Sequence, residues 1–118
     1  MLTTSRKKRE SIQDYRVDLL SWLKEAPDHG SRYLNAAWRE GPEAFLVALK
    51  DVVDARGGVT KLAKKTGMHR VSLHGVLSKA GNPRLENLSR ILDALGIEVA
   101  LTSKTIHKAA TKRRAKAG

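Results

Sequence analysis

Glycine and proline divide this chain into short segments, and within most segments the apolar residues recur at steps of three and four positions. That spacing places them on one face of an α-helix, so the chain is constrained to short helices that bury their apolar faces against one another. Helices are expected over roughly residues 12–26, 31–40, 42–56, 60–66, 70–79 and 84–95, and Ser11 is the expected cap of the first. The apolar face of the first comprises Ile12, Tyr15, Leu19, Trp22, Leu23 and Ala26, and that of the last comprises Leu85, Leu88, Ile91, Leu92 and Leu95. The alternating residues 97–102 predict a possible short strand at the C-terminal side.

The length of 118 residues is typical of one domain with a modest core. We expect a basic N-terminal arm over residues 1–10, a helical extension over 11–40, a compact helical domain over 42–102, and a basic flexible tail over 103–118. The chain contains no cysteine, no apolar run near 18 residues and no apolar segment after its basic start. A cytoplasmic protein with no membrane partner is therefore expected.

Positive charge is concentrated in one part of the expected domain. The chain carries 23 Lys and Arg against 12 Asp and Glu, a net charge of +11. No acid occurs between Asp54 and Glu86, and the cations there are Arg56, Lys61, Lys64, Lys65, Arg70, Lys79 and Arg84. Such a segment indicates a surface that faces a polyanion, although solvated helix faces are also often rich in lysine.

The same segment has the pattern of a helix-turn-helix. Two short helices flank Gly67, where a turn with positive φ favours glycine, and the small Ala63 permits close packing. The second helix would enter the major groove of double-stranded DNA, where Arg70 can pair with guanine. The expected DNA-binding residues are Lys61, Lys64, His69, Arg70, Val71, Ser72, His74, Lys79, Asn82 and Arg84. The plainer alternatives are a helix cap for His69, a core position for Val71 and a solvated side chain for Arg70.

Several short runs together resemble a known family. They are residues 33–37 (YLNAA), 45–49 (FLVAL), 55–58 (ARGG), 62–68 (LAKKTGM) and 77–83 (LSKAGNP), followed by the leucines of the last helix. Residues 62–96 look like the lambda-repressor/Xre helix-turn-helix, and the whole set is similar to the addiction-module antidote family, the HigA-like antitoxins. The resemblance implies an all-α, lambda-repressor-like bundle that forms a cytoplasmic homodimer. It also implies binding of a RelE-like ribonuclease toxin and repression of the protein's own operon. Gly75 in the recognition helix and the long basic tail depart from the family pattern.

Catalysis has little support in the sequence. The four histidines form no metal-binding spacing, and no glycine-rich phosphate loop follows a strand. Asp51 and Asp54 share a helix face, but we expect both to be solvated. No catalytic residue, metal or cofactor is therefore expected. Two alternatives to an antitoxin remain: a phage-type helix-turn-helix repressor without a toxin partner, and a nucleoid or RNA-binding protein that uses its basic ends.

Two protein interfaces are expected as well. Acids are frequent between residues 10 and 28, and a toxin that handles RNA is expected to be basic, so the candidate toxin-binding residues are Asp14, Asp18, Trp22 and Glu25. Trp22 could instead belong to the core. Ile97, Val99 and Leu101 are the candidate dimer interface, because a lone strand needs a partner edge. Packing of these three side chains on their own monomer is the alternative.

Overall fold

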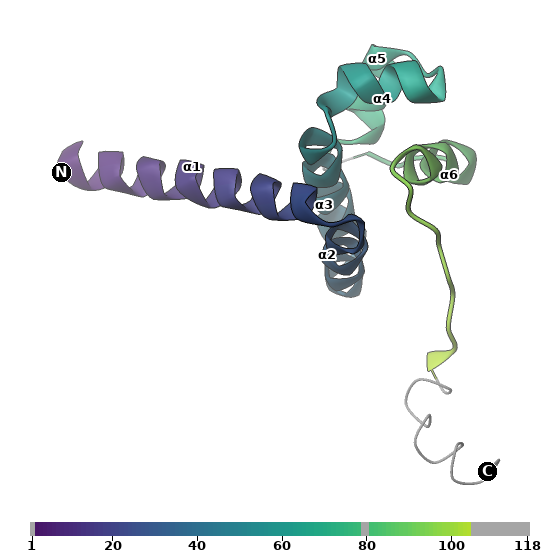
Figure 1. Ribbon diagram of the computed structural model, residues 1–118, viewed down its shortest axis with the longest axis horizontal. Coiled ribbons are helices and arrows are strands. Elements are labelled where there is room, and N and C mark those ends of the chain that lie inside the picture. The colour runs from purple at the N-terminus through teal and green to yellow at the C-terminus, as the bar shows by residue number, and fades with distance from the viewer. Residues whose placement is uncertain (1, 79–80, 105–118) are drawn as a thin grey trace, which may run out of the picture.

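The computed structural model describes residues 2–78 and 81–104. Over these residues the chain forms helices α1 (Leu2–Glu25), α2 (Pro27–Glu40), α3 (Pro42–Ala55), α4 (Gly58–Thr66), α5 (Arg70–Val76) and α6 (Leu85–Ala94). Figure 1 shows α2 beside α3, with α4, α5 and α6 grouped at one end of α3 and α1 projecting from the bundle. The all-α prediction is confirmed. Lys79 and most of the expected tail, residues 105–118, lie outside the described residues.

Helix boundaries follow local chemistry, and the starts of α1 and α2 differ most from expectation. α1 begins at Leu2 rather than Ile12, so the expected arm is part of one continuous helix. α2 begins at Pro27 rather than Ser31, because proline lacks an N–H and is tolerated in the first turn of a helix. Ala26 is extended, with φ −146° and ψ 143°, and separates the two helices. Proline therefore starts a helix here, where the sequence had suggested only an end.

The core is centred on α3, whose Leu49, Val52 and Val53 are almost completely buried. Leu23 from α1 and Leu34 from α2 pack on one part of it. The part of the chain from α4 to the end of α6 adds further buried side chains, among them Val59, Leu62, Leu73, Leu77, Ile91, Leu92 and Leu95. One apolar cluster thus joins the N-terminal helices to the helix-turn-helix.

The predicted apolar faces are only partly buried. Ile12 and Tyr15 are exposed, because α1 projects from the bundle on its N-terminal side (Figure 1). Leu85 is also exposed, since it is the first residue of α6 and points away from the core that Ile91 and Leu92 enter. Amphipathic spacing thus indicated that both segments are helical. It overestimated how many of their apolar side chains are buried against the other helices.

A group of polar side chains fastens α1 to α2 and α3. Arg16 donates to Asp51 at 2.8 Å and to Asp54 at 2.7 Å, and the Tyr33 hydroxyl donates to Asp51 at 2.7 Å. Lys50 pairs with Asp54 at 3.0 Å. Asp51 is only 7% exposed, so the expectation of a solvated carboxylate was wrong at this position. Its donors lie on helices distant in the sequence, which helix spacing alone could not show.

The expected strand is absent from the described residues. Residues 97–103 leave α6 as extended chain without strand pairing (Figure 1), because a single chain offers this segment no second edge. The Ile97 N–H bonds to the Leu92 carbonyl at 2.9 Å, and the Ile97 side chain packs partly against the core. Val99 and Leu101 remain exposed. In the part of the chain that the structure describes, no helix is long and apolar enough to cross a membrane.

Candidate nucleic-acid interface

The turn between α4 and α5 is held by short local hydrogen bonds. Gly67 adopts φ 73°, a left-handed conformation that glycine takes at little cost, and its N–H bonds to the Ala63 carbonyl at 2.9 Å. The Thr66 hydroxyl donates to the Leu62 carbonyl at 2.8 Å and accepts from the Met68 N–H at 3.2 Å. Leu62 and Leu73 are buried beneath the turn. The two short helices therefore meet in a well-defined geometry, as the sequence predicted from Gly67.

α5 presents its polar side outward. Arg70, Ser72 and His74 are all exposed, whereas Leu73 is fully buried between them. Val71 is 73% exposed, so the alternative of a core position does not hold. His69 caps the helix, because its Nδ1 accepts the Val71 N–H at 3.3 Å. The cap leaves Nε2 of His69 as the ring atom that is free to meet a ligand.

The residues expected to contact DNA phosphates lie on both sides of α5 in the sequence. Lys64 is exposed on α4, and Asn82 and Arg84 are exposed on the segment that leads into α6. Arg84 is also the residue that precedes the first turn of α6, with an extended backbone. These residues precede and follow α5 in the sequence. Residues that contact the DNA backbone on either side of a recognition helix are expected at such positions.

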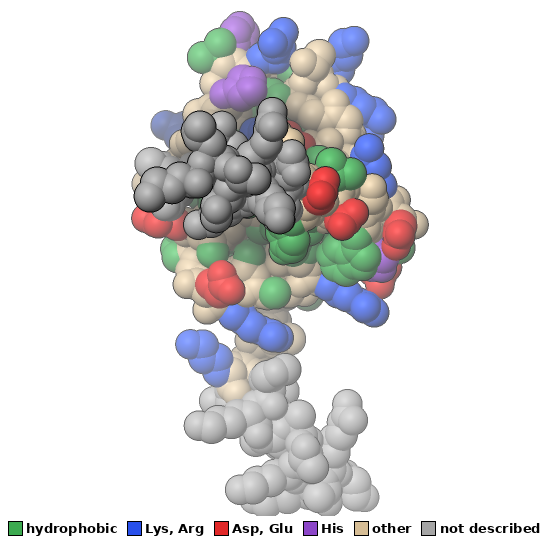
Figure 2. Space-filling model, turned by 90° about the vertical axis from the view of Figure 1, so that its left-hand side faces the viewer, with side chains coloured by type: hydrophobic (Ala, Val, Ile, Leu, Met, Phe, Trp, Pro, Cys, Tyr) green, Lys and Arg blue, Asp and Glu red, His purple; other side chains and the backbone are tan. Residues whose placement is uncertain are grey.

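Charge on this part of the protein has one sign. Helices α4 and α5 and the turn between them contain no acid, and no ion pair among the described residues involves Lys61, Lys64, Lys65 or Arg70. Figure 2 shows histidine and basic side chains gathered at the end of the molecule that α4 and α5 form, with acidic side chains nearer the middle of that view. A surface of unpaired cations attracts a polyanion at long range.

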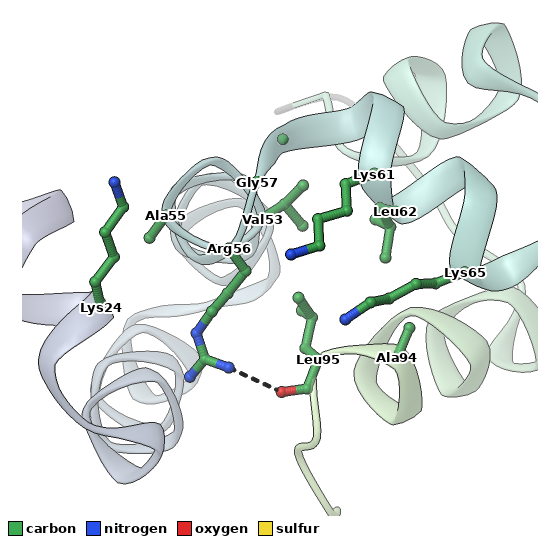
Figure 3. Close-up of a pocket in the computed structure, with 11 residues that line it drawn as sticks. Lys24, Val53, Ala55, Arg56, Gly57, Lys61, Leu62, Lys65, Ala94 and Leu95 are labelled. Atoms are coloured by element: carbon green, nitrogen blue, oxygen red, sulfur yellow. Dashed lines mark hydrogen bonds between the residues drawn. The ribbon is translucent and has the colours of Figure 1, made fainter.

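Lys61, one of the expected DNA-binding residues, is exposed on α4 and directed toward the start of that helix. Its side chain turns back over Gly57, where a Cβ atom would lie 2.5 Å from Lys61 Cδ. Figure 3 shows Lys61 and Lys65 reaching from α4 into a cleft that Arg56 and Leu95 also line. Arg56 and Lys65 belong to the acid-free basic segment of the sequence, and neither is among the expected DNA-binding residues. The lack of acids between Asp54 and Glu86 is the one sequence signal that could have pointed to Arg56 and Lys65. Their convergence depends on how α3 packs against α4.

The candidate toxin-binding residues share one face of α1. Asp14, Asp18, Trp22 and Glu25 follow one another at steps of four, four and three positions, and the three acids are exposed. Trp22 is at the border between exposed and half-buried, and its ring stacks on His29 at a centroid distance of 4.3 Å. The His29 Nδ1–H donates to the Trp22 carbonyl at 2.6 Å. Trp22 therefore has an intramolecular partner on one side and solvent on the other.

Comparisons with known proteins support one family. The sequence model of a family described as "Probable addiction module antidote protein" matches residues 14–103. The chain is also similar to the small ribosomal subunit protein uS8 of Thermoanaerobacter sp. (strain X514) and of Caldanaerobacter subterraneus subsp. tengcongensis, with 30% identity over 82 residues in each case. That similarity covers 64% of this chain and 62% of the length of the ribosomal proteins. No solved structure matches the chain.

Proposed function

This chain belongs to the addiction module antidote family, and from that membership we propose that it is the antitoxin of a type II toxin–antitoxin module. In this proposal the protein is a cytoplasmic homodimer that binds operator double-stranded DNA and represses its own operon. It also neutralises a RelE-like ribonuclease toxin. The family match over residues 14–103 carries the antitoxin role, because that range includes the candidate toxin-binding face on α1 as well as the helix-turn-helix.

The DNA-binding part of the proposal rests on α5. Arg70 stands in the first turn of this helix with its guanidinium unpaired among the described residues. A guanidinium can donate two parallel hydrogen bonds to guanine O6 and N7 in the major groove. Ser72 and His74 are exposed beside it, and the exposed Val71 can contact a thymine methyl group. Lys64, Asn82 and Arg84 would hold the phosphates and set the register of the helix.

A repressor without a toxin partner is the alternative, since its DNA-binding surface would have the same chemistry. The acidic face on α1 favours the antitoxin, because a repressor needs no such face to bind DNA. A short reading frame for a basic toxin directly beside this gene would support the antitoxin, and its absence would favour the simple repressor.

Operator binding is tested with a gel-shift titration on the DNA upstream of the gene, beside a random duplex of equal length. We expect Arg70→Ala to lose about 1–3 kcal/mol on the operator and to relax the preference at one base pair. Lys64→Ala should weaken both duplexes equally, because phosphate contacts carry no sequence information. If a dimer contacts about 6–10 phosphates, affinity should fall about 10³–10⁵-fold between 50 and 200 mM salt. Equal affinity of the unaltered protein for the operator and the random duplex would contradict DNA recognition.

A further inference from the structure

A cleft of about 370 Å³ lies where the end of α3 meets the start of α4 and the end of α6 (Figure 3). Its walls include the apolar side chains of Val53, Leu62 and Leu95. Its charged lining consists of Lys24, Arg56, Lys61 and Lys65, with no acid. Pockets of this size are typical of sites that take small organic molecules.

The cations of α4 converge on the cleft, although their side chains remain exposed to solvent. Lys61 and Lys65 are one helical turn apart on α4, and both ammonium groups point into the cleft toward Arg56 and Leu95 (Figure 3). Lys24 lies at its edge on α1. None of these four cations has an ion-pair partner among the described residues. Their charges are therefore available to attract an anion into the cleft.

Arg56 is positioned by the backbone of two other elements. Its Nη1 donates to the Leu95 carbonyl at 3.3 Å, and its Nη2 donates to the Pro27 carbonyl at 3.4 Å. A guanidinium has five N–H donors, so further donors remain after these two contacts. The guanidinium is thus held at the cleft before any ligand arrives, which lowers the entropic cost of binding.

The start of α4 adds a second source of positive potential. Gly57, with φ 109°, precedes the helix, and no side chain caps its first turn. Unsatisfied N–H groups and the helix dipole both favour an anion at such an end. The absence of a Cβ at Gly57 also leaves room for the stem of Lys61, which would otherwise be displaced from the cleft.

The geometry points to a phosphate-binding site in this cleft, formed by Arg56, Lys61, Lys65 and the start of α4. Two or more linked phosphates match the number of cations better than a single carboxylate does, and the apolar walls can cover an attached organic group. Two sources of phosphate fit this chemistry: a free phosphorylated small molecule and the backbone of a nucleic acid. No residue of α5 lines the cleft, so the site is separate from the proposed base-reading surface.

Calorimetric titration of the full chain with pyrophosphate, at matched ionic strength in sodium chloride, tests the site. Lys65→Gln and Lys64→Gln form a matched pair, because the two lysines are neighbours on α4, both are exposed, and only Lys65 lines the cleft. We expect saturable binding that Lys65→Gln weakens about tenfold, the size of one charge-assisted hydrogen bond, and that Lys64→Gln leaves within about twofold. Lys61→Gln should behave like Lys65→Gln, and thermal unfolding should confirm that every variant folds.

A second titration with a random duplex identifies the source of the phosphate. If Lys65→Gln weakens duplex binding relative to the unaltered protein, the cleft takes a backbone phosphate. If Lys65→Gln binds the duplex as the unaltered protein does, the cleft takes a free phosphorylated molecule, and both results support the site when pyrophosphate binds. Failure of pyrophosphate to saturate, or equal weakening by Lys64→Gln, would overturn it. The pyrophosphate titration needs neither operator nor toxin, so its failure is distinct from failure of the proposed function.

Discussion

Asp51 shows how a single buried carboxylate can organise the junction of three helices. It accepts hydrogen bonds from Arg16 on α1 and Tyr33 on α2, at 2.8 and 2.7 Å. Burial, together with the hydrogen bond to Asp51 and its negative charge, raises the pKa of Tyr33, so the phenol stays protonated and remains a donor. The hydrogen bond to Asp51 likewise raises the pKa of Arg16 above its ordinary value. A buried charge is tolerated only with such partners, and here both are present.

Replacing Asp51 by alanine should lower the free energy of unfolding by about 1–3 kcal/mol, because the half-buried hydroxyl of Tyr33 loses its acceptor and Arg16 loses one of two partners. Urea unfolding followed by far-UV circular dichroism measures the change. Asp54→Ala is the control, since Asp54 is more exposed, and its loss should cost about 0–1 kcal/mol. An effect of Asp51→Ala no larger than that of Asp54→Ala would show that the contacts to Asp51 add little to stability.

At the scale of the helices, the sequence predicted a helix or turn correctly where a single residue type determines the local backbone. Gly67 predicted the turn of the helix-turn-helix, and the leucine spacing predicted α6 closely. Pro27 was ambiguous, because proline both ends one helix and begins the next. The sequence could not show the cleft at Lys61 and Lys65, because the cleft depends on how α4 packs against α3 and α6. Sites formed within one element were thus predictable, and sites formed between elements were not.

The acidic face of α1 is an element-scale hypothesis with a direct test. We expect the combined substitution of Asp14→Asn, Asp18→Asn and Glu25→Gln to weaken binding of a basic toxin at least tenfold, by removing complementary charge, while operator binding is unchanged. Calorimetry with the toxin encoded beside the gene measures the first effect, and a gel shift measures the second. The same loss of three charges on the exposed Glu40, Glu43 and Asp93 is the matched control.

Substitution tests this face better than deletion of residues 1–28, because the deletion would also remove the fully buried Leu23 and the Arg16 contacts. If the control triple weakens toxin binding as much as the α1 triple does, overall charge and not this face governs the interaction. If neither triple changes toxin binding, the toxin docks elsewhere.

At the scale of the whole molecule, the extended segment after α6 is the candidate dimer interface. Ile97 packs partly on its own monomer, as the alternative proposed, whereas Val99 and Leu101 are 63% and 92% exposed. The backbone of residues 98–102 has no strand partner within the described chain. Two such segments from separate chains could pair their edges and bury these side chains together.

The combined substitution Val99→Asp and Leu101→Asp should convert the dimer to a monomer, because burying a charge at a paired edge is costly. Multi-angle light scattering at micromolar concentration measures the mass. Leu85→Asp is the control, since Leu85 is equally exposed but lies on α6. A mass of 13.0 kDa for the unaltered protein would contradict the dimer, and so would a dimer that survives both aspartates.

The projecting α1 also affects how the protein moves through solvent. The radius of gyration is 17.7 Å and the longest dimension is 61 Å, whereas a compact chain of 100 residues has a radius of gyration of about 13 Å. Such a shape raises the frictional coefficient, so a single chain would elute from a sizing column ahead of a sphere of equal mass. The elution volume of the monomer would therefore resemble that of a compact dimer. A partner that docks along α1 would add mass with little added length. The sedimentation coefficient would then increase more than the small change in elution volume suggests.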